Sequence, residues 1–546
     1  MKKTLFQSTD FKRIIESYEN YEIIRDIHHG VNAEICYYKY KESSIGDTMT
    51  LNLESDIQIS KIFTDKAIGT VVHGIKGETP ITIWFPVEPN YYIYDEFGRI
   101  RRCDEMKKKF TWNINSQILV SAAEILNEEG EILIPCIKFT DQHSIYFSEL
   151  SSLSENERKL YRRSEWFFAS SIGSIWEYLL HGSLYDPRSN KINGNRFKCQ
   201  QCAYTWWKYL EKLLSITGKN IYALMRDEVA YSILLDLDDD GGWRHGFWSD
   251  DMETHARFHL DGLELFISQY ELTLDTLWFE AAQRGMSFIF ENLTDHLDED
   301  LLWFLHDTME DNKHHYFRST VFGKDSGNSL CINTHTHALR VLYRLHKHSL
   351  NDHIYISAYK KGMQALKKVL EYQPASVMYR PIIKWALNGR VMVHKNRMRR
   401  KLNSLIKKWA LQPLYWKLQE KYPRLVQPNG FIERDLSLTY VSDNYHVTNI
   451  KELLKLYELE KSEWLKEYIV NGVRFINHYL SRKGIRNAVR SNPYYIEVID
   501  ILVMYSRLIE EIPQTYIETV RNAIYEASGG YSIEGQTTKP ETAEVS

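Results

Sequence analysis

A succession of helical patterns occupies most of this chain and constrains its fold more than any other feature. Apolar residues recur at helical spacing in short segments from about residue 155 to 528, and polar turns separate the segments. Several neighbours are joined closely enough to form αα-hairpins, and Gly218 falls where one helix should end. The expected segments are 155–184, 200–216, 219–236, 253–270, 274–292, 333–348, 353–372, 377–420, 445–459, 462–480, 493–510 and 513–527.

Part of this helical region repeats. The stretches THARFHLDGLELF and THALRVLYRLH both begin Thr-His-Ala, and their alanines, Ala256 and Ala338, are 82 residues apart. Apolar residues follow each alanine at i+4 and i+7, and looser echoes begin near residues 445 and 492. Such a repeat predicts stacked helical hairpins, which form either an open solenoid or a closed ring.

The first 150 residues have a different pattern. Short runs rich in β-branched and aromatic residues, such as GTVVHGIKG and GEILIPCIKFTD, are separated by turn signals. We therefore expect a β-rich domain over 1–150, a helical domain over 151–528 and a disordered polar tail over 529–546. A basic helical insertion is expected near 377–425.

Composition limits the class of protein. The chain has 546 residues, 43% of them hydrophobic and 26% charged, as in soluble globular proteins. A net charge of -4 provides no general attraction to nucleic acid. Six cysteines are too few for a disulfide framework, and no signal peptide or membrane span is recognisable, so we expect a cytoplasmic protein. Cys199 and Cys202 form a CxxC pair, but no further zinc ligands stand near them in sequence.

Polar residues mark the starts of the expected inner helices. In a ring of hairpins these starts would meet at one end and form a shared site. Asn, Thr and Asp also cap helices, so each position alone has a structural explanation. The residues concerned are Cys202, Tyr204, Glu253, His255, Arg257, Asn333, His335, His337, Asp443, Tyr445, His446, Asn492, Tyr494 and Tyr495.

An acidic, aromatic loop precedes the helix at 253–270. Asp236, Asp238 and Asp240 alternate before Gly241, which is the first half of a calcium loop, although Phe247 replaces the closing glutamate of an EF-hand. We expect Ca²⁺ as the possible cofactor; the alternative is an acidic loop without a metal. Trp243 and Trp248 each lie beside a glycine turn, which suits a ring that stacks on sugar, or a ring that is buried.

The stretch from Arg390 to Arg424 is strongly basic, with Glu420 its only acid. Leu402, Leu405 and Trp409 form an apolar stripe at helical spacing. This pattern predicts an amphipathic helix that binds an anionic membrane surface or polymer, and the alternative is a solvated surface hairpin. The expected location is therefore cytoplasmic, peripheral to the inner face of the membrane.

A β-rich front, helical hairpins and the turns DGGW, THAR and NTHTHA together resemble the α/α-toroid carbohydrate-active proteins. Uronyl C5-epimerases and polysaccharide lyases are the types that we name, and the resemblance covers residues 151–528. It implies an α+β multidomain fold with a large α/α-toroid domain, a ring of helical hairpins, behind the β-rich domain. The implied partner is an acidic polysaccharide or a lipid-linked glycan, in the biosynthesis of an exported polysaccharide.

The resemblance also implies a chemistry. Both reactions begin with removal of the C5 proton beside a sugar carboxylate, so the site needs a base and a group that neutralises the carboxylate. We expect catalytic groups among Tyr445, His446, Glu253, His255, His337 and Tyr494. We expect substrate binding by Trp243, Trp248, Arg257, Asn333, His335, Arg490 and Tyr495.

Two alternatives stay open at this stage. A glycoside hydrolase would need two carboxylates across the scissile bond, with candidates Glu253, Asp261, Glu433 and Asp443. A non-catalytic module of glycan assembly at the membrane would depend on the basic segment instead. No Gly-rich phosphate loop, GxSxG elbow or HExxH motif is present, which disfavours nucleotide-dependent, serine-hydrolase and zinc-protease functions.

Overall fold

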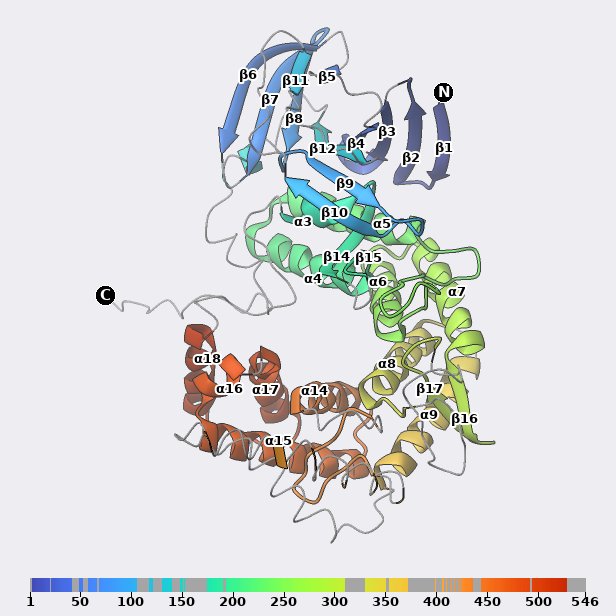
Figure 1. Cartoon of the computed structure of the whole chain (residues 1–546), viewed down its shortest axis with the longest axis vertical. Helices are drawn as coiled ribbons and strands as arrows, with labels where there is room; N and C mark the ends of the chain where they lie inside the picture. Colours follow the sequence, from blue (N-terminus) through green and yellow to red (C-terminus); the bar gives the residue numbers. More distant parts are fainter. Residues whose placement is uncertain are drawn as a thin grey trace, which may run out of the picture. The chain divides into compact units, whose positions relative to one another are not determined.

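The computed structural model describes the chain as two compact units (Figure 1). Among described residues, the first unit contains those up to Asp239 together with Trp243–Glu253, and the second contains Asp240–Gly242 and those from Thr254 onward. The described residues are 2–19, 21–41, 49–52, 57–65, 68–105, 117–120, 130–139, 148–150, 152, 174–189, 193–309, 329–349, 353–371, 424–435, 443–491 and 493–527, with single positions at 398, 405, 406, 409, 414, 417 and 421.

An antiparallel sheet forms most of the first unit. Its strands follow the order β1-β2-β3-β4-β12-β9-β10-β15-β14-β13, and β6, β7 and β8 branch from it through β8 on β12. Strand bounds are β1 Lys2–Gln7, β2 Phe11–Ser17, β3 Tyr21–His28, β4 Ala33–Lys41, β6 Ile57–Asp65, β7 Gly69–Lys76, β8 Thr79–Phe85, β9 Asn90–Tyr94, β10 Ile100–Glu105, β12 Glu131–Phe139, β13 Leu179–Leu180, β14 Ser183–Ser189 and β15 Arg196–Lys198. Strands β5 (Met49–Asn52) and β11 (Gln117–Val120) pair separately.

The centre of this sheet is strand β12, EILIPCIKF, which is buried at every position after its first. A continuous apolar run of this kind fits a strand that is covered on both faces. Tyr38, Ile83 and Ile134 lie in the same buried cluster. The β-rich front that the sequence predicts is confirmed, including the runs at 69–77 and 130–139.

Helices α3 (Ser174–Tyr178), α4 (Gln200–Thr217) and α5 (Asn220–Leu235) complete the first unit. A buried ion network joins α5 to the sheet: Glu228 accepts from the Tyr37 hydroxyl at 2.7 Å and lies 3.0 Å from Nε2 of His28. Arg13 pairs with Asp26 at 2.6 Å beside it. Burial raises the pKa of the Asp26 carboxyl to about 7 although Arg13 opposes the shift.

The second unit consists of helical hairpins, so the predicted α+β class, a β-rich front followed by stacked α/α hairpins, is confirmed. Helix α6 packs on α7, α8 on α9, and α14 on α15, while α6, α8, α14 and α17 pack in succession as inner helices. Bounds are α6 Ala256–Thr273, α7 Thr276–Asn292, β16 Thr294–Asp298, β17 Leu301–Phe304, α8 Ile332–His348, α9 His353–Glu371, α14 Asp443–Leu459, α15 Glu463–Lys483, α16 Ile485–Ser491, η5 Pro493–Glu497, α17 Val498–Leu508 and α18 Gln514–Ala527.

Three of these hairpins are joined in the same way. The fourth residue of the inner helix is a buried histidine, and its Nε2 lies against the main-chain carbonyl of a glycine in the outer helix. The pairs are His259–Gly285 at 3.0 Å, His335–Gly362 at 3.0 Å and His446–Gly472 at 3.2 Å. We call these the His–Gly pairs. A carbonyl only accepts, so Nε2 carries the proton in each histidine.

Glycine is required at the outer position of each pair because the inner helix lies against it. A Cβ atom at Gly362 would overlap the side chain of Leu339, which lies one turn after His335. The equivalent overlaps are Gly285 with Leu263 and Gly472 with Ile450. The close approach of the two backbones therefore depends on the missing side chain.

The register of the repeat differs from the predicted one. Helices α6 and α8 begin at Ala256 and Ile332, so equivalent positions are 76 residues apart and not 82. The triplet at 254–256 ends on the first residue of α6, whereas the triplet at 336–338 begins at the fifth residue of α8. The Thr-His-Ala similarity is thus not a structural equivalence, although the prediction of repeated hairpins is right.

Most helix predictions agree with the structure within about three residues. Gly218 ends α4 in the left-handed conformation, with φ of 67°. The helix expected over 155–184 lies outside the described residues as far as 173. Its predicted end is wrong, because α3 ends at Tyr178 and strands β13 and β14 begin at Leu179 and Ser183. The predicted disordered tail lies outside the described residues. None of the helices with described residues is long and apolar enough to cross a membrane.

Candidate functional site

The loops before the inner helices of the second unit hold one another in place. The first amide of α6, at Ala256, donates to the carbonyl of His306 at 2.9 Å. The first amide of α8, at Ile332, donates to the carbonyl of Arg434 at 3.0 Å. Free amides at a helix start need acceptors, and here the following loop supplies them. This arrangement brings His306 beside the start of α6 and Arg434 beside the start of α8.

Five side chains from these loops and first turns form what we call the helix-start cluster: His255, His306, Arg434, Tyr445 and Tyr494. The His255 and His306 rings meet edge to face at 4.3 Å. Nη2 of Arg434 lies 2.7 Å from Nε2 of His306, and its guanidinium lies over the Tyr445 ring at 4.7 Å. The ring of Tyr494 lies 5.8 Å from that of Tyr445. The starts of four inner helices, α6, α8, α14 and α17, or the loops before them, thus contribute to one cluster.

The bond from Arg434 fixes the state of His306. Guanidinium only donates, so Nε2 of His306 must accept and the ring proton is on Nδ1. Nδ1 then donates to the Thr334 hydroxyl, 3.0 Å away. Burial lowers the pKa of Arg434, but Asp435 and Tyr445 outweigh it and hold that pKa well above its ordinary value. The cluster therefore presents one permanent positive charge beside a neutral imidazole and a phenol.

A second group of charges lies further along the same inner helices. This inner charge cluster contains Arg257, Asp261, Glu264, His337, Arg340, Glu452 and Lys455. The Arg340 guanidinium bridges Glu264 on α6 and Glu452 on α14. Burial alone would raise the pKa of both carboxyls, but Arg340 holds each well below its ordinary value.

His337 lies inside this cluster and is buried. Its Nε2 is 3.6 Å from Glu264 and 3.9 Å from Asp261, and neither ring nitrogen makes a hydrogen bond within the described part of the chain. Burial, followed by the charge of Arg257, lowers the pKa of His337 below its ordinary value. His337 is therefore a neutral imidazole that faces two carboxylates.

The ligand atoms of Asp261, Glu264 and His337 lie within 4.8 Å of one another, a spacing at which they could hold a metal ion. The electrostatics disfavour one. Asp261, Glu264 and Glu452 are already matched in number by Arg257, Arg340 and Lys455, so a divalent cation would bring excess positive charge into a buried region. We treat this cluster as a charge-balanced brace between α6, α8 and α14.

The structure places the predicted site residues in three different settings. Tyr445, Tyr494 and His255 meet in the helix-start cluster. Arg257 and His337 belong to the inner charge cluster, and Arg257 also donates to the main-chain carbonyl of Asn333 at 2.9 Å. The Asn333 side chain is buried and accepts from the Cys331 thiol at 2.9 Å. Arg490 is exposed on α16, away from a described partner.

Other predicted residues lie in the hydrophobic core. His335 and His446 form His–Gly pairs, and their Nδ1 atoms accept from the amides of Phe304 and Ile432 at 3.2 and 2.9 Å. Burial lowers their pKa values to about 3 and about 4. With both nitrogens bonded to backbone, we no longer propose them as catalytic or sugar-binding groups. Tyr495 is fully buried and stacks on Tyr479 at 4.8 Å, so it too has a packing role.

The loop at 243–253 belongs to the first unit and holds itself together. The Glu253 carboxylate accepts from the amides of Trp248 and Ser249 at 2.6 and 3.1 Å. Burial raises the pKa of Glu253 although these bonds oppose the shift. Trp243 is buried and donates to the carbonyl of Ile233 at 3.1 Å, so it is a core residue and not a stacking platform. Trp248 is half-buried beside Phe247.

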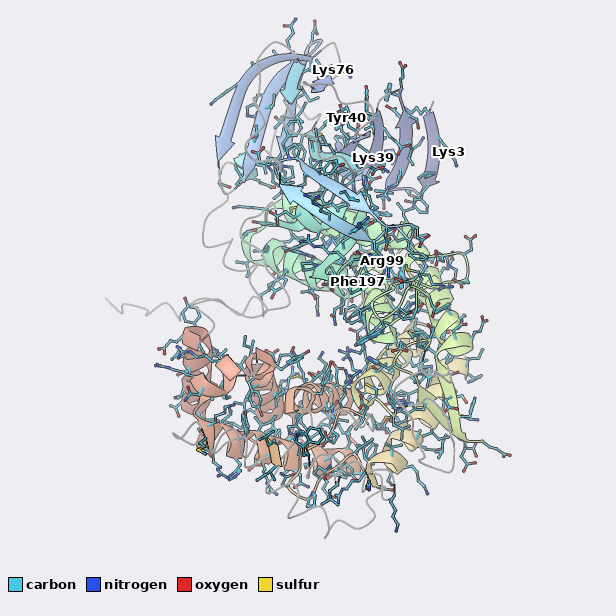
Figure 2. The ribbon with its side chains drawn as sticks, in the orientation of Figure 1. Lys3, Lys39, Tyr40, Lys76, Arg99 and Phe197 are labelled. Atoms are coloured by element: carbon cyan, nitrogen blue, oxygen red, sulfur yellow. The ribbon has the colours of Figure 1, made fainter. Side chains whose placement is uncertain are left out.

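Two residues outside the loop hold it to the sheet, and both are labelled in Figure 2. Arg99 donates to the carbonyl of Gly246 at 3.0 Å and pairs with Asp250 at 2.6 Å. The Phe197 ring lies 4.9 Å from that of Phe247. The aromatic residues of this loop therefore serve mainly to anchor it.

The predicted calcium ligands have other partners. Asp236 accepts from Lys198 at 2.8 Å and from the Ser183 hydroxyl at 2.9 Å. Asp240 accepts from the amide of Gly242 at 2.9 Å, as in a turn without metal. Asp236, Asp238 and Asp240 do not form one of the metal-compatible groups found in the described parts of the chain. Calcium binding stays a prediction.

The basic segment from Arg390 to Arg424 lies outside the described residues except at single positions. Its last residue, Arg424, is buried and donates to the carbonyl of Val426 at 2.8 Å, so Arg424 is not part of a solvated basic face. Leu405 and Trp409, from the predicted apolar stripe, are exposed.

Sequence reasoning missed His306, Arg434 and the brace of Glu264, Arg340 and Glu452. His306 and Arg434 lie in loops, where no periodicity marks a residue. The brace carried a usable signal: His337 and Arg340, like Asp261 and Glu264, are polar residues three apart on one face of an otherwise apolar helix.

Comparisons with known proteins agree in kind with the sequence resemblance. No family model and no curated protein matches the chain. Among solved structures, a polysaccharide lyase is similar over 96% of this chain and 82% of its own, with 10% identity and a TM-score of 0.29. A sugar epimerase from a ruminal bacterium is similar over 52% of this chain and 76% of its own, with 10% identity and a TM-score of 0.29.

An unsaturated glucuronyl hydrolase specific for heparin is similar over 54% of this chain and 78% of its own, with 12% identity and a TM-score of 0.29. Likeness at this level carries no conclusion about the chemistry of the present site, which rests on its own residues.

Proposed function

We propose that this chain is an enzyme that modifies a uronate-containing glycan by removing the C5 proton, through epimerisation or elimination. The observation that carries the proposal is the position of Arg434, whose guanidinium lies over the Tyr445 ring and against Nε2 of His306. This reaction needs a fixed cation for the sugar carboxylate and a proton acceptor beside it.

Arg434 is suited to the carboxylate. Its side chain is 17% exposed, and Asp435 and His306 fix its orientation through contacts at 3.1 and 2.7 Å. A guanidinium has five N–H donors, more than these contacts use, and it binds a carboxylate with two parallel hydrogen bonds. As the C5 proton leaves, negative charge moves onto the carboxylate oxygens, and a preorganised guanidinium stabilises that charge.

Tyr445 is the proposed base and Tyr494 the second proton-transfer group. The C5 proton passes to the oxygen of Tyr445 in its phenolate form, and the electron pair of the broken bond enters the carboxylate as an enolate. Return of a proton from the Tyr494 hydroxyl to the opposite face gives the C5 epimer. Expulsion of the C4 oxygen, which takes a proton from the Tyr494 hydroxyl as it departs, gives a 4,5-unsaturated sugar. Both hydroxyl groups come from half-buried residues of neighbouring helix starts.

The test is incubation of the full chain in D₂O with a panel of glycans that contain glucuronate, mannuronate or galacturonate. Deuterium at C5, or a product that absorbs in the near ultraviolet, is the expected result. New reducing ends without deuterium or unsaturation would show a glycoside hydrolase and overturn the proposal. No change in any glycan would overturn it as well, provided that the protein is folded.

We further propose a role in making an exported polysaccharide at the inner face of the membrane, with lipid-linked or nascent acidic glycan as partner. The basic segment at 390–424 supports this role through its sequence alone. Flotation with vesicles of anionic and of neutral lipid tests it. Binding that requires anionic lipid and weakens in high salt is expected, whereas equal recovery with neutral vesicles would contradict it.

A further inference from the structure

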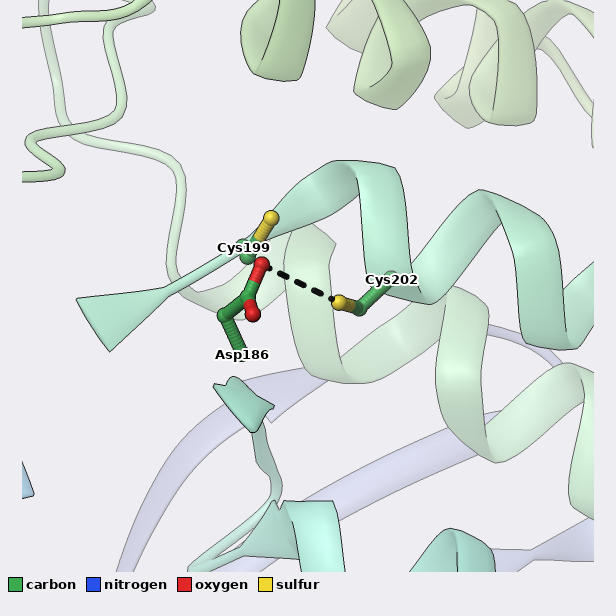
Figure 3. Close-up of side chains that lie close together, drawn as sticks. All are labelled: Asp186, Cys199 and Cys202. Carbon is green, nitrogen blue, oxygen red and sulfur yellow. Dashed lines mark hydrogen bonds between the residues drawn. The ribbon is translucent and has the colours of Figure 1, made fainter. Parts of the chain in front are cut away.

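The CxxC pair acquires a third partner in the structure. Cys199 is the residue before α4 and Cys202 lies in the first turn of that helix. Asp186, on strand β14, lies against both (Figure 3). The ligand atoms of these three residues lie within 4.8 Å of one another, and the exposed fractions of Asp186, Cys199 and Cys202 are 0%, 1% and 2%.

We propose that Asp186, Cys199 and Cys202 bind a zinc ion that ties β14 to the start of α4. Thiolate and carboxylate are both zinc ligands, and two thiolates select against magnesium and calcium. The site is closed, which fits a structural ion and not a catalytic one. A fourth ligand from the protein, such as a main-chain carbonyl, would complete the tetrahedron.

The spacing already suits the ion. Sγ of Cys202 lies 3.5 Å from Oδ2 of Asp186. A tetrahedral zinc ion with bonds of about 2.3 Å to sulfur and about 2.0 Å to oxygen separates these two ligands by about 3.5 Å. The distance within this ligand pair therefore matches the ion, and the ligand atom of Cys199 lies within 4.8 Å of both.

Local connections hold the ligands in this place. Strands β14 and β15 pair antiparallel, with Tyr185 opposite Lys198, and the amide of Cys199 donates to the carbonyl of Leu184 at 2.9 Å. Binding releases the two thiol protons and leaves zinc with two thiolates and one carboxylate.

The test is metal analysis of the full chain, purified without chelator and compared with the Cys199→Ser/Cys202→Ser and Asp186→Asn variants. Cys103→Ser is the matched control, because Cys103 is a half-buried cysteine remote in sequence from the site. Equimolar zinc is expected in the wild type and the control. None is expected in the double variant, and weaker retention against a competing chelator is expected in Asp186→Asn.

Cobalt substitution counts the thiolates directly. The wild type should show a near-ultraviolet thiolate-to-cobalt band, and Cys199→Ser or Cys202→Ser alone should lose about half of it. If the variants do not fold, chelation of the wild-type protein alone decides: its melting temperature should fall and recover with zinc. Zinc retained equally by the double variant, a Cys199–Cys202 disulfide without metal, or a melting temperature indifferent to zinc and chelator would each overturn the proposal.

Discussion

Nη2 of Arg434 lies 2.7 Å from Nε2 of His306, and this contact determines which side chain in the helix-start cluster can take a proton. The Nε2 lone pair of His306 is occupied as long as Arg434 stays in place. Tyr445, on the other side of the same guanidinium, then becomes the natural base. In the proposed reaction Arg434 would therefore have two functions, since it would bind the substrate carboxylate while its contact with His306 occupies Nε2 of that ring.

Replacement of Arg434 should affect the transition state more than binding. In Arg434→Lys a point charge replaces the planar fork, and kcat on a uronate glycan should fall by about 10²- to 10³-fold. The measurement is steady-state kinetics beside Arg507→Lys, a control on an exposed arginine of α17. An equal, small loss in both variants would exclude Arg434 from the site.

Tyr445→Phe removes one oxygen and keeps the ring that lies under Arg434. We expect a loss of about 10²- to 10⁴-fold in turnover, with an unchanged melting temperature, because the Tyr445 oxygen, as the phenolate, is the proposed acceptor of the C5 proton. Tyr525→Phe, on the exposed side of α18, is the matched control. Deuterium incorporation at C5 that survives in Tyr445→Phe would assign the base to another residue.

Arg340 holds the inner charge cluster together, so its loss should destabilise the fold. In Arg340→Met the carboxylates of Glu264 and Glu452 lose the cation that bridges them, at a cost of about 3–5 kcal/mol in the free energy of unfolding. Urea denaturation measures this cost. Addition of Glu264→Gln and Glu452→Gln should recover part of it, and a triple variant no more stable than Arg340→Met would contradict the bridge.

The His–Gly pairs predict that alanine destabilises the protein at a paired glycine but not at a glycine with open space around it. Gly362→Ala or Gly472→Ala forces the inner and outer helices apart and should lower the free energy of unfolding by about 1–3 kcal/mol. Gly30→Ala is the control, because a Cβ atom there meets no other atom within 4 Å. Similar melting temperatures for Gly362→Ala and Gly30→Ala would show that α8 and α9 can accommodate a Cβ atom between them, which would contradict the prediction.

Acid should unfold the protein partly through these histidines. His335 and His446 have folded pKa values of about 3 and about 4, below the ordinary value of 6.5 that they regain on unfolding. At a pH between the folded and the unfolded pKa of each histidine, the unfolded chain binds more protons than the folded one. The contribution of these histidines to stability is therefore full above about pH 6.5 and falls as the pH drops towards 4. His446→Gln should make denaturation midpoints less dependent on pH over this window, and an unchanged dependence would contradict the assignment.

The hairpins were predictable because helical periodicity is a local property of the sequence. The predicted segments 219–236 and 353–372 agree with α5 and α9 to within one residue at each end. The register of the repeat was not predictable in the same way. The sequence alignment of the repeat was based on the shared tripeptide Thr-His-Ala. The structurally equivalent residues are instead His259, His335 and His446, and their equivalence is evident only from the glycine that each contacts.

The candidate site was predicted in part, for a physical reason. Tyr445, Tyr494 and His255 were identified because they begin helices, and helix starts are marked in a sequence. His306 and Arg434 are fixed by main-chain hydrogen bonds between distant loops, which leave no trace in residue type. Asp186 was not predicted as a partner of the CxxC pair for the same reason, since only the pairing of β14 with β15 brings it to Cys199 and Cys202.

The His–Gly pairs place different sequence requirements on the inner and the outer helices. On each outer helix the acceptor is a main-chain carbonyl next to a missing side chain, so the pair itself requires one residue type, glycine, at one position of that helix. The outer layer could accept new surface chemistry, such as an affinity handle or a docking motif, while the inner wall keeps its curvature. The exposed face of the outer helices should therefore tolerate substitution better than the inner helices do.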